Sequence, residues 1–369
     1  MQNTAQITAP VISWEDCIVP KGCSYSQTLT NRLAASCGPK PSVTEDLVDF
    51  VNICSLMSIN SNLVAKVTPH RIYSIDLHSS LHNSPLVAAG DKWGHVGLWN
   101  VIPEKSSAND GVCLFKPHVS PVNCVKFSDY DQSTLFSSSY DGTVRRCDVN
   151  KQQFELVYST PDEDDIQHMY LSEVDMNRVC VASTDSCIAY IDSRTSSVRS
   201  FDTQSGKLKC VSHHPIEKHY FITASVKGHV DLLPHKKGVL SAFFSPTSGE
   251  KILSCSAGDE IKVYNSTDMT NIETESSFYH NNFTGRWLSN FRASWHPSRE
   301  DCFLIGSMKH PRQIDLIGCD GKLLHTFHDN GDLLQSVTSL NAFHPSLPFM
   351  AGGNSSGRVF VFMAQMDCL

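Results

Sequence analysis

The segment PHVSPVNCVKFS, residues 117–128, aligns without gaps with PHKKGVLSAFFS, residues 234–245. In both, the His is followed by Val four residues later, by Phe nine residues later and by Ser ten residues later. Other segments share the second half of this pattern: a short alternating strand, a turn of the His-Pro or Ser-Pro type, and a second apolar strand that ends in small residues. They are YSIDLHSS, CVSHHPIEKHYFITAS, RASWHPSREDCFLIGS and LNAFHPSLPFMAGG. Such self-similarity predicts a repeat architecture.

The turn after the first strand of each unit marks the period of the repeat. Subtraction of successive marker positions gives intervals of 50, 44, 42, 31, 51 and 48 residues. Units of about 40–50 residues match the four-stranded blades of a propeller. The sequence therefore predicts an all-β fold, a seven-bladed WD40 β-propeller. The marker residues are His78, Ser128, Ser172, His214, Ser245, His296 and His344.

A tight turn that contains Asp leads into the third strand of several units. Asp at such a turn accepts hydrogen bonds from backbone N–H groups and tolerates unusual backbone dihedrals. The spacing from this Asp to the polar residue that ends the strand is typical of WD repeats, and Trp99-Asn100 is the pair nearest to the WD dipeptide. The segments are GDKWGHVGLWN, YDGTVRRCD, TDSCIAYID and GDEIKVYN, with Asp91, Asp141, Asp185 and Asp259 at the turns.

One interval is too short for a complete blade. The interval from His214 to Ser245 is only 31 residues, and ASVKGHVDLLPHKKGV leads from one unit almost directly into the His of the next. Either the outer strand is missing or one strand serves two roles. The short interval results either from a deletion in this chain or from a naturally short blade. We expect a shortened blade near residues 214–235.

A different segment precedes the repeats. Residues 42–45, SVTE, have the capping-box pattern of a helix N-terminus, and apolar residues then follow at helical spacing. They are Leu47, Phe50, Val51 and Cys54. We expect a short helix packed against the propeller. The expected organisation is poor order over residues 1–40, a helical extension over 41–65 and the propeller over 66–364.

The composition and the motifs argue against an enzyme. Hydrophobic residues make up 40% of the chain and charged residues 18%, as in an ordinary globular protein without a membrane span. No C-x-x-C or H-E-x-x-H occurs, so we expect neither a metal site nor another cofactor. The G-x-S-x-G match at residues 353–357 lies between two strand-like runs, whereas a nucleophile elbow precedes a helix. Recurrence of His at one position of the repeat indicates packing, so no small-molecule substrate is expected.

Basic and aromatic residues in the loops are the candidates for binding. Lys and Arg pair with phosphates, and a neighbouring aromatic ring stacks or wedges between bases. The net charge of −8 argues against coating of nucleic acid by bulk charge but leaves room for a local basic patch. From the residues alone, DNA binding and a protein-interaction scaffold both remain open, and Trp287 is either a wedge or a packing anchor. The candidates are Arg71, Lys92, Trp93, Arg286, Trp287, Lys309 and Arg312.

Long strings within residues 66–362 resemble the WD repeat-containing protein 76 family, of which this chain looks like a shortened form. The strings are VAAGDKWGHVGLWNV, FFSPTSGEKILS, GRWLSNFRASWHPSREDCFLIGSM and NAFHPSLPFMAGGNSSGRVFVF. That family is related to the small WD-repeat subunit of the damaged-DNA-binding complex. The resemblance implies a nuclear propeller of the DNA-damage response or of chromatin. One of its faces would bind DNA, and the other would dock the adaptor of a cullin-RING ubiquitin ligase, for which the protein would be a substrate receptor.

In the damage-binding relative, a hairpin before a late blade inserts side chains at a lesion, and basic residues around the channel grip phosphates. By resemblance these roles pass to Arg71, Lys92, Trp93 and the 281–287 hairpin, with Lys309 and Arg312 as neighbours. Adaptor docking uses a W-D-x-R signature, and the blade that should carry it is the shortened one. The match that this sequence retains is Ile191-Asp192-Ser193-Arg194, so Asp192 and Arg194 are the docking candidates.

Overall fold

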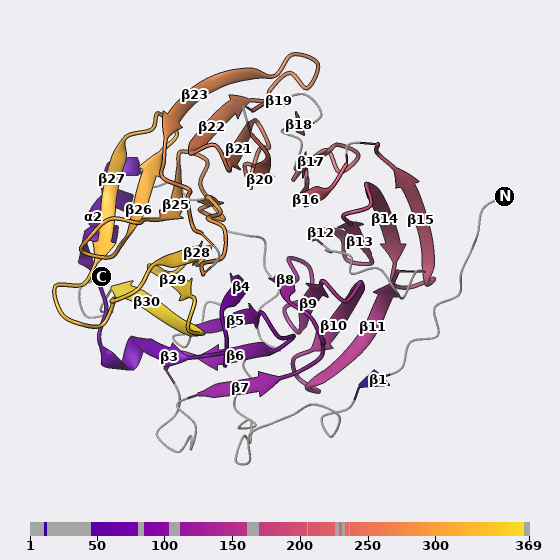
Figure 1. The fold of residues 1–369 in the computed structure, drawn as a ribbon, viewed down its shortest axis with the longest axis horizontal. Coiled ribbons are helices and arrows are strands. Elements are labelled where there is room, and N and C mark those ends of the chain that lie inside the picture. Colours follow the sequence, from indigo (N-terminus) through magenta and orange to yellow (C-terminus); the bar gives the residue numbers. More distant parts are fainter. Residues whose placement is uncertain are drawn as a thin grey trace.

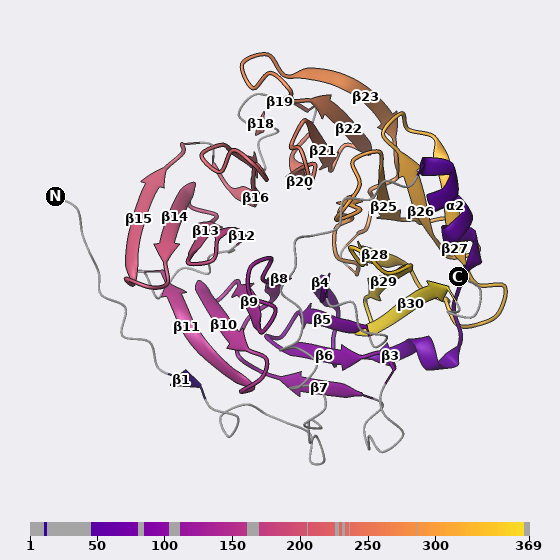
Figure 2. The same ribbon diagram turned by 180° about the vertical axis from the view of Figure 1, so that it is seen from behind.

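The strands of the protein form sheets arranged around a central axis. The computed structural model describes residues 11–12, 46–79, 85–102, 111–160, 170–204, 206–225, 229–230, 233–235, 237–285 and 287–364. In each complete sheet of four strands, successive strands pair in sequence order, and the first strand lies nearest the axis (Figure 1). Figure 2 shows the same arrangement from behind. The prediction of an all-β propeller is confirmed.

The complete sheets follow one another along the chain, and their strands have the following bounds. The first contains β4 (Ile72–Leu77), β5 (Leu86–Asp91), β6 (Val96–Asn100) and β7 (Val112–Phe115); the second β8 (Val122–Phe127), β9 (Thr134–Ser139), β10 (Thr143–Asp148) and β11 (Gln153–Ser159); the third β12 (Tyr170–Asp175), β13 (Arg178–Ala182), β14 (Cys187–Asp192) and β15 (Ser197–Asp202). After the shortened sector come β20 (Val239–Phe244), β21 (Lys251–Ser256), β22 (Glu260–Asn265) and β23 (Glu273–Tyr279); then β24 (Ser294–Trp295), β25 (Cys302–Gly306), β26 (Gln313–Gly318) and β27 (Leu323–His328); and finally β28 (Thr338–Phe343), β29 (Phe349–Asn354) and β30 (Arg358–Ala364).

The last sheet obtains its outer strands from the N-terminal side of the chain. Both β2 (Met57–Ser58) and β3 (Val64–Lys66) pair antiparallel with β30. A short 3-10 helix, η2 (Ser61–Leu63), connects them. Because this pairing joins the two ends of the propeller, the ring is closed by backbone hydrogen bonds. Far upstream, β1 (Val11–Ile12) adds a fifth strand beside β11. The other residues of the segment 1–40, for which poor order is expected, lie outside the described ranges.

The predicted count of seven blades is corrected to six. Between the third and fourth complete sheets, the described residues form only the hairpin of β16 (Leu208–His213) and β17 (Phe221–Ser225) and a separate pair, β18 (His229–Val230) and β19 (Leu233–Pro234). The few residues between β17 and β20 leave no length for two outer strands of normal size. The inner strands nevertheless stay joined, because the Ala242 N–H donates to Cys210 Sγ at 3.1 Å.

The predicted short helix is confirmed as α2 (Leu47–Leu56). Its N-cap is Asp46, whose side chain accepts a hydrogen bond from the Leu47 N–H at 2.7 Å. The capping box expected at residues 42–45 lies outside the described residues. Phe50 and Cys54 are buried against the last two sheets, as the helical spacing predicted. No helix in the described ranges has the length and apolar character to cross a membrane.

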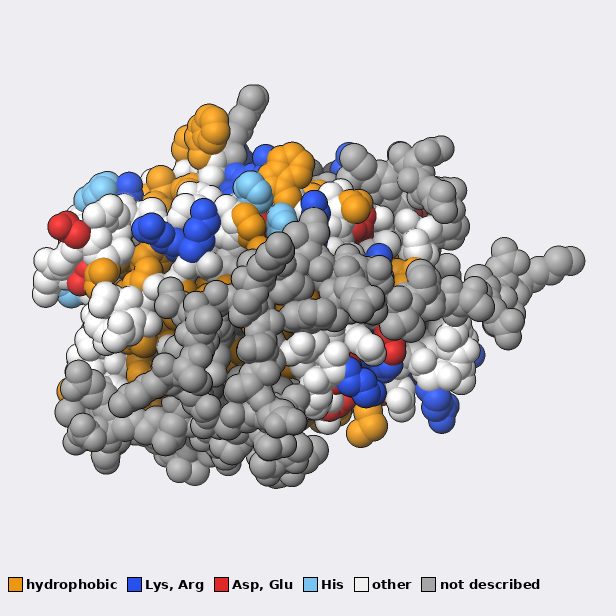
Figure 3. Space-filling model, turned by 90° about the horizontal axis from the view of Figure 1, so that it is seen from below, with side chains coloured by type: hydrophobic (Ala, Val, Ile, Leu, Met, Phe, Trp, Pro, Cys, Tyr) orange, Lys and Arg blue, Asp and Glu red, His pale blue; other side chains and the backbone are white. Residues whose placement is uncertain are grey.

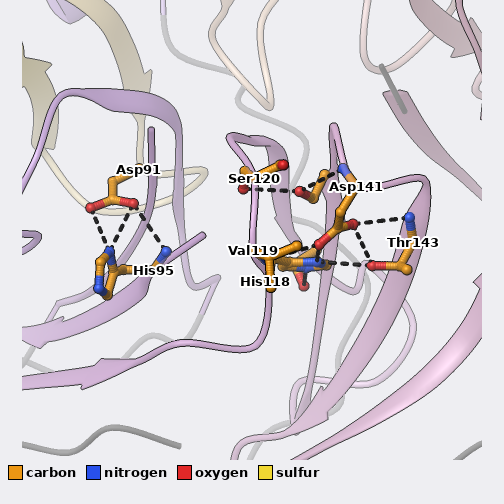
Figure 4. A network of polar contacts seen from close by, with 9 residues as sticks. Asp91, His95, His118, Val119, Ser120, Asp141 and Thr143 are labelled. Atoms are coloured by element: carbon orange, nitrogen blue, oxygen red, sulfur yellow. Dashed lines mark hydrogen bonds and ion pairs between the residues drawn. The ribbon is translucent and has the colours of Figure 1, made fainter. Parts of the chain in front are cut away.

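The His of the two aligned segments links the loop before the inner strand to the second and third strands. His118 Nε2 lies 2.8 Å from Ser137 Oγ, and its Nδ1 lies 3.2 Å from the Asp141 carboxylate (Figure 4). In the equivalent position His235 Nε2 lies 2.8 Å from Ser254 Oγ. The repeat in the sequence therefore reflects one buried polar network that recurs in different blades.

Asp76 ties the first blade to the second and provides a test of this packing. Its carboxylate accepts a hydrogen bond from the Phe127 N–H at 2.7 Å. Burial raises the pKa of Asp76 from 3.8 to about 6, with Lys126 opposing the shift. A raised pKa means that the folded state holds the proton more tightly, so stability is complete below about pH 4 and falls as the pH rises through about 6.

Asp76→Asn should therefore stabilise the protein at pH 7.5, by up to about 3 kcal/mol, since one pKa unit corresponds to about 1.4 kcal/mol. Asn keeps an acceptor for the Phe127 N–H without the buried charge. Urea unfolding of both proteins between pH 4.5 and 8 measures the difference, and the exposed Asp268→Asn is the control. A gap between wild type and variant that stays constant over this range would contradict the assignment.

Candidate nucleic-acid interface

The predicted DNA-binding residues belong to loops on one face of the propeller. Because antiparallel strands alternate in direction, the links that enter each inner strand and the turns between second and third strands lie at the same face, here called the upper face. Turns between first and second and between third and fourth strands lie at the opposite, lower face. Seen edge-on in Figure 3, Lys and Arg side chains, His rings and protruding hydrophobic side chains gather along one rim.

The described candidates divide between these two kinds of upper-face loop. Arg71 and Trp287 lie in links before inner strands, Lys92 and Trp93 in the β5–β6 turn, and Lys309 and Arg312 in the β25–β26 turn. Arg286 lies outside the described residues, so its predicted position at the DNA face remains a prediction.

The β5–β6 turn presents a lysine and a half-exposed tryptophan. Lys92 Nζ lies 5.2 Å from the centre of the Trp93 ring, and 51% of Trp93 is exposed. The exposed His70 ring lies 6.1 Å from Trp93. The Lys92 N–H donates to the Arg71 carbonyl at 3.0 Å, which joins this turn to the link before β4. These contacts place Arg71, Lys92 and Trp93 together.

The turn is rigid because Asp91 organises its backbone. The buried Asp91 carboxylate accepts hydrogen bonds from the N–H groups of Trp93 at 2.8 Å and of His95 at 3.0 Å, and the His95 ring contacts the same carboxylate (Figure 4). Held in this way, Lys92 and Trp93 lose little backbone freedom when they bind a ligand.

The link between β23 and β24 is anchored at both ends. On one side, the Asn282 N–H donates to Asp259 at 2.8 Å, and the Asn282 side-chain amide donates to the Ser256 carbonyl at 2.8 Å. On the other side, the buried Ser289 hydroxyl donates to the Ile72 carbonyl. The second anchor places this link next to β4 and therefore next to Arg71.

Between these anchors, two aromatic side chains point into solvent. Phe283 is 77% exposed and Trp287 is 85% exposed. Between them Gly285 has a φ of +60°, which glycine adopts without strain. Of the two interpretations of Trp287, a wedge or a packing anchor, the packing anchor is corrected: the side chain packs against little in the described structure and is displayed.

In the β25–β26 turn one cationic side chain is exposed and another is bonded to the turn itself. Lys309 is exposed, with its Nζ 3.9 Å from the Asp315 carboxylate. Arg312 is only partly exposed, and its guanidinium donates to the Met308 carbonyl of the same turn at 2.9 Å. Lys309 is thus better placed than Arg312 to meet a ligand.

Sequence reasoning missed the residues at the upper end of the central channel. Arg292, just before β24, donates to the Asn123 carbonyl at 3.2 Å and lies 5.7 Å from the centre of the Tyr170 ring. The rings of Tyr73 and Tyr140 are 6.1 Å apart nearby. These residues come from strands, turns and links that are distant in sequence. The local signal for Arg292 is its place as a polar residue just before an inner strand.

The two docking candidates lie at the lower face. In the β14–β15 turn, Asp192 accepts hydrogen bonds from the N–H groups of Arg194 at 2.9 Å and Thr195 at 3.2 Å. Asp192 therefore closes its own turn, while Arg194 is exposed. A partner that binds Arg194 would approach from the side opposite to Lys92 and Trp287.

Comparison with known proteins agrees with the repeat and with the longer strings. Residues 111–148 match the family described as WD domain, G-beta repeat. WD repeat-containing protein 76 of Xenopus laevis is 38% identical over 342 residues, which are 88% of this chain and 58% of that protein. The Mus musculus protein of the same name is 36% identical over 329 residues, 84% of this chain and 52% of that protein. The resemblance to the WD repeat-containing protein 76 family is confirmed.

The similarity extends to fungal proteins with a functional name. DNA damage-binding protein CMR1 of Phaeosphaeria nodorum is 29% identical over 346 residues, 81% of this chain and 66% of that protein. The chain spans about half the length of the WD repeat-containing protein 76 relatives, 58% and 52% in the two cases above. The propeller fold and the names of these relatives indicate a binding or scaffold protein. No group of three or more His, Cys, Asp or Glu side chains in the described part of the chain is placed to hold a metal ion.

Proposed function

We propose that the chain is a nuclear protein that binds DNA, including damaged or modified DNA, through its upper face in the DNA-damage response or in chromatin. The observation that carries this proposal is the display of Phe283 and Trp287 on an anchored loop beside the cations of the first blade. Exposed aromatic rings stack on bases, and Lys or Arg beside them neutralises phosphates. The names of the CMR1 relatives support the same ligand.

The charge of the upper face has to be local, because the whole chain carries a net charge of −8. Lys92 is exposed and forms no ion pair with another described residue, so its charge is available to a phosphate. Lys309 is 65% exposed at its side chain, and its distance of 3.9 Å from Asp315 leaves that contact weak. A patch of this kind attracts DNA at short range and is screened by salt.

The dependence of DNA affinity on salt tests this proposal. Fluorescence anisotropy with a labelled duplex should give a log–log slope near −3 if Arg71, Lys92 and Lys309 each meet a phosphate, since each contact adds about −0.9. Lys92→Met should weaken binding about fivefold, which corresponds to about 1 kcal/mol, and reduce the slope by about 1. Binding that does not respond to salt, or no binding at all, would sink the proposal.

We further propose that the lower face docks the adaptor of a cullin-RING ligase, so that the chain serves as a substrate receptor on chromatin. The exposure of Arg194 on that face favours this role, because DNA and adaptor could then bind together. A protein-interaction scaffold that binds chromatin proteins without contacting DNA is the competing function.

Arg194→Ala should reduce recovery of the adaptor in a pull-down at least severalfold, because charge-assisted hydrogen bonds contribute about 1.5–3 kcal/mol. Asp192 remains in place in this variant, so the turn is preserved. If wild type and variant recover the adaptor equally, Asp192-Ser193-Arg194 is not the docking site.

A further inference from the structure

Side chains from several blades meet across the upper end of the central channel. The ring of Tyr73, in β4, lies 6.1 Å from the ring of Tyr140, in the β9–β10 turn. A side-chain hydrogen bond joins Tyr140 to Tyr170, the first residue of β12. Arg292 reaches over the Tyr170 ring, at 5.7 Å, and donates to the Asn123 carbonyl at 3.2 Å. The four side chains of Tyr73, Tyr140, Tyr170 and Arg292 are here called the channel septum.

The septum has positive charge without a carboxylate partner. Lys209, near the start of β16, has its pKa lowered by burial and by the charges of Arg292 and Lys207. Neither Arg292 nor Lys209 forms an ion pair with another described residue. Burial raises the pKa of Tyr140 and Tyr170, so both hydroxyls keep their protons, and one of these protons forms the hydrogen bond between the two side chains. Uncompensated cations beside hydroxyl donors suit a compact anion.

There is space for a ligand next to Arg292. A cavity of about 680 Å³ is lined by Arg292, Cys124 and Ser212 and continues towards the lower face. The carboxylates that line it are those of Asp76, Glu173 and Asp129. Asp76 and Glu173 lie further along their strands and already accept backbone N–H groups.

Asp76 and Glu173, which lie towards the lower face, are thus already engaged in hydrogen bonds within the protein. Lys126 pairs with Asp129 at 3.0 Å, which leaves that charge balanced as well. At its upper end the cavity is lined by Arg292, and Lys209 lies near enough for the charge of Arg292 to lower its pKa.

We propose that the channel septum, together with Lys209, is a binding site for a phosphate monoester. Arg292 presents a planar fork of N–H donors that matches phosphate oxygens, and Lys209 supplies a second charge. A monoester carries about −1.5 to −2 charges at pH 7, more than the single charge of a backbone phosphodiester. The phosphate comes either from the end of a nucleic-acid strand or from a free phosphorylated molecule. Arg292 belongs to the same β23–β24 link as Phe283 and Trp287 but follows the Ser289 anchor, so the site is separate from the residues proposed to hold a DNA duplex.

Isothermal titration of the full chain with inorganic pyrophosphate tests the site. Wild type should bind the probe, and Arg292→Gln should weaken binding about tenfold or more, because charge-assisted hydrogen bonds are about twice as strong as neutral ones. Arg292→Lys should retain part of the affinity, and Lys209→Met, which leaves the septum in place, should weaken binding independently. The affinity for a blunt duplex without terminal phosphates should stay within about twofold in Lys209→Met.

Lys92→Met separates this site from the proposed DNA face, since it should weaken duplex binding and leave pyrophosphate binding unchanged. A 5′-phosphorylated oligonucleotide that binds more tightly than its 5′-hydroxyl form identifies a strand end as the source, and equal binding of the two identifies a free phosphorylated molecule. Absence of pyrophosphate binding to wild type at millimolar concentration overturns the site. So does unchanged binding in both Arg292→Gln and Lys209→Met, provided that their melting curves match wild type.

Discussion

Combined replacement of Phe283 and Trp287 by Ala should lower the affinity for a duplex with an unpaired base by about 2–6 kcal/mol, since stacking of one base on an aromatic ring contributes about 1–3 kcal/mol. The effect should be smaller for a fully paired duplex, in which a ring must first unstack two bases before it can insert. Because the two side chains are 77% and 85% exposed, their loss should leave the unfolding midpoint unchanged.

Fluorescence anisotropy with paired and mismatched duplexes measures both affinities. Ile216→Ala is the matched control, because Ile216 is 67% exposed in a lower-face turn. It should change neither affinity. Equal affinity of wild type and the double variant for the mismatched duplex would mean that these rings do not contact bases.

Phe50→Ala should reduce the free energy of unfolding by about 3–5 kcal/mol, as for other buried Phe side chains. Phe50 is 8% exposed, its ring lies 5.0 Å from the His296 ring, and the Arg299 guanidinium lies 4.8 Å from its centre. Removal of the ring leaves a cavity between α2 and the last two blades. It also exposes the segment whose β2 and β3 close the propeller.

Urea unfolding followed by circular dichroism gives this difference. Val48→Ala is the control on the same helix, since Val48 is 63% exposed and its loss should change stability by less than about 0.5 kcal/mol. If Phe50→Ala were as stable as Val48→Ala, α2 would contribute little to the closed ring.

The repeat, the propeller and the helix could be predicted from the sequence because each depends on local pattern. His118 and His235 occupy one register position, and each makes the same contact with a Ser of the second strand. The blade count could not be predicted from the spacing alone. The unit marked by His214 has too few residues for four strands. It is therefore one of the repeats in the sequence, but in the structure it forms a hairpin and not a complete blade.

The binding residues were predictable only where the turn chemistry is local. The turn pattern that begins at Asp91 places Lys92 and Trp93 at the tip of the β5–β6 hairpin, and this can be inferred from the sequence. The exposure of Trp287 depends instead on the bond from Ser289 to Ile72, which are 217 residues apart. In the same way, the contact of Arg292 with Asn123 joins residues 169 positions apart and has no signature in either segment.

The upper and lower faces differ in what they offer to a partner. The upper face combines exposed aromatic rings with Lys92 and Lys309, whereas the predicted docking turn on the lower face offers Arg194 beside an Asp that is used by its own backbone. This separation allows DNA on one side and a protein on the other, and it makes the choice of face the central claim.

Charge reversal on each face, measured in one anisotropy titration, tests that claim most directly. Lys92→Glu combined with Lys309→Glu should weaken binding of a labelled duplex by about tenfold or more, since each lost charge-assisted contact contributes about 1 kcal/mol or more. Arg194→Glu changes the net charge by the same amount per residue but should leave the affinity within about twofold of wild type. Equal losses in the two variants, or a larger loss in Arg194→Glu, would contradict DNA binding by the upper face.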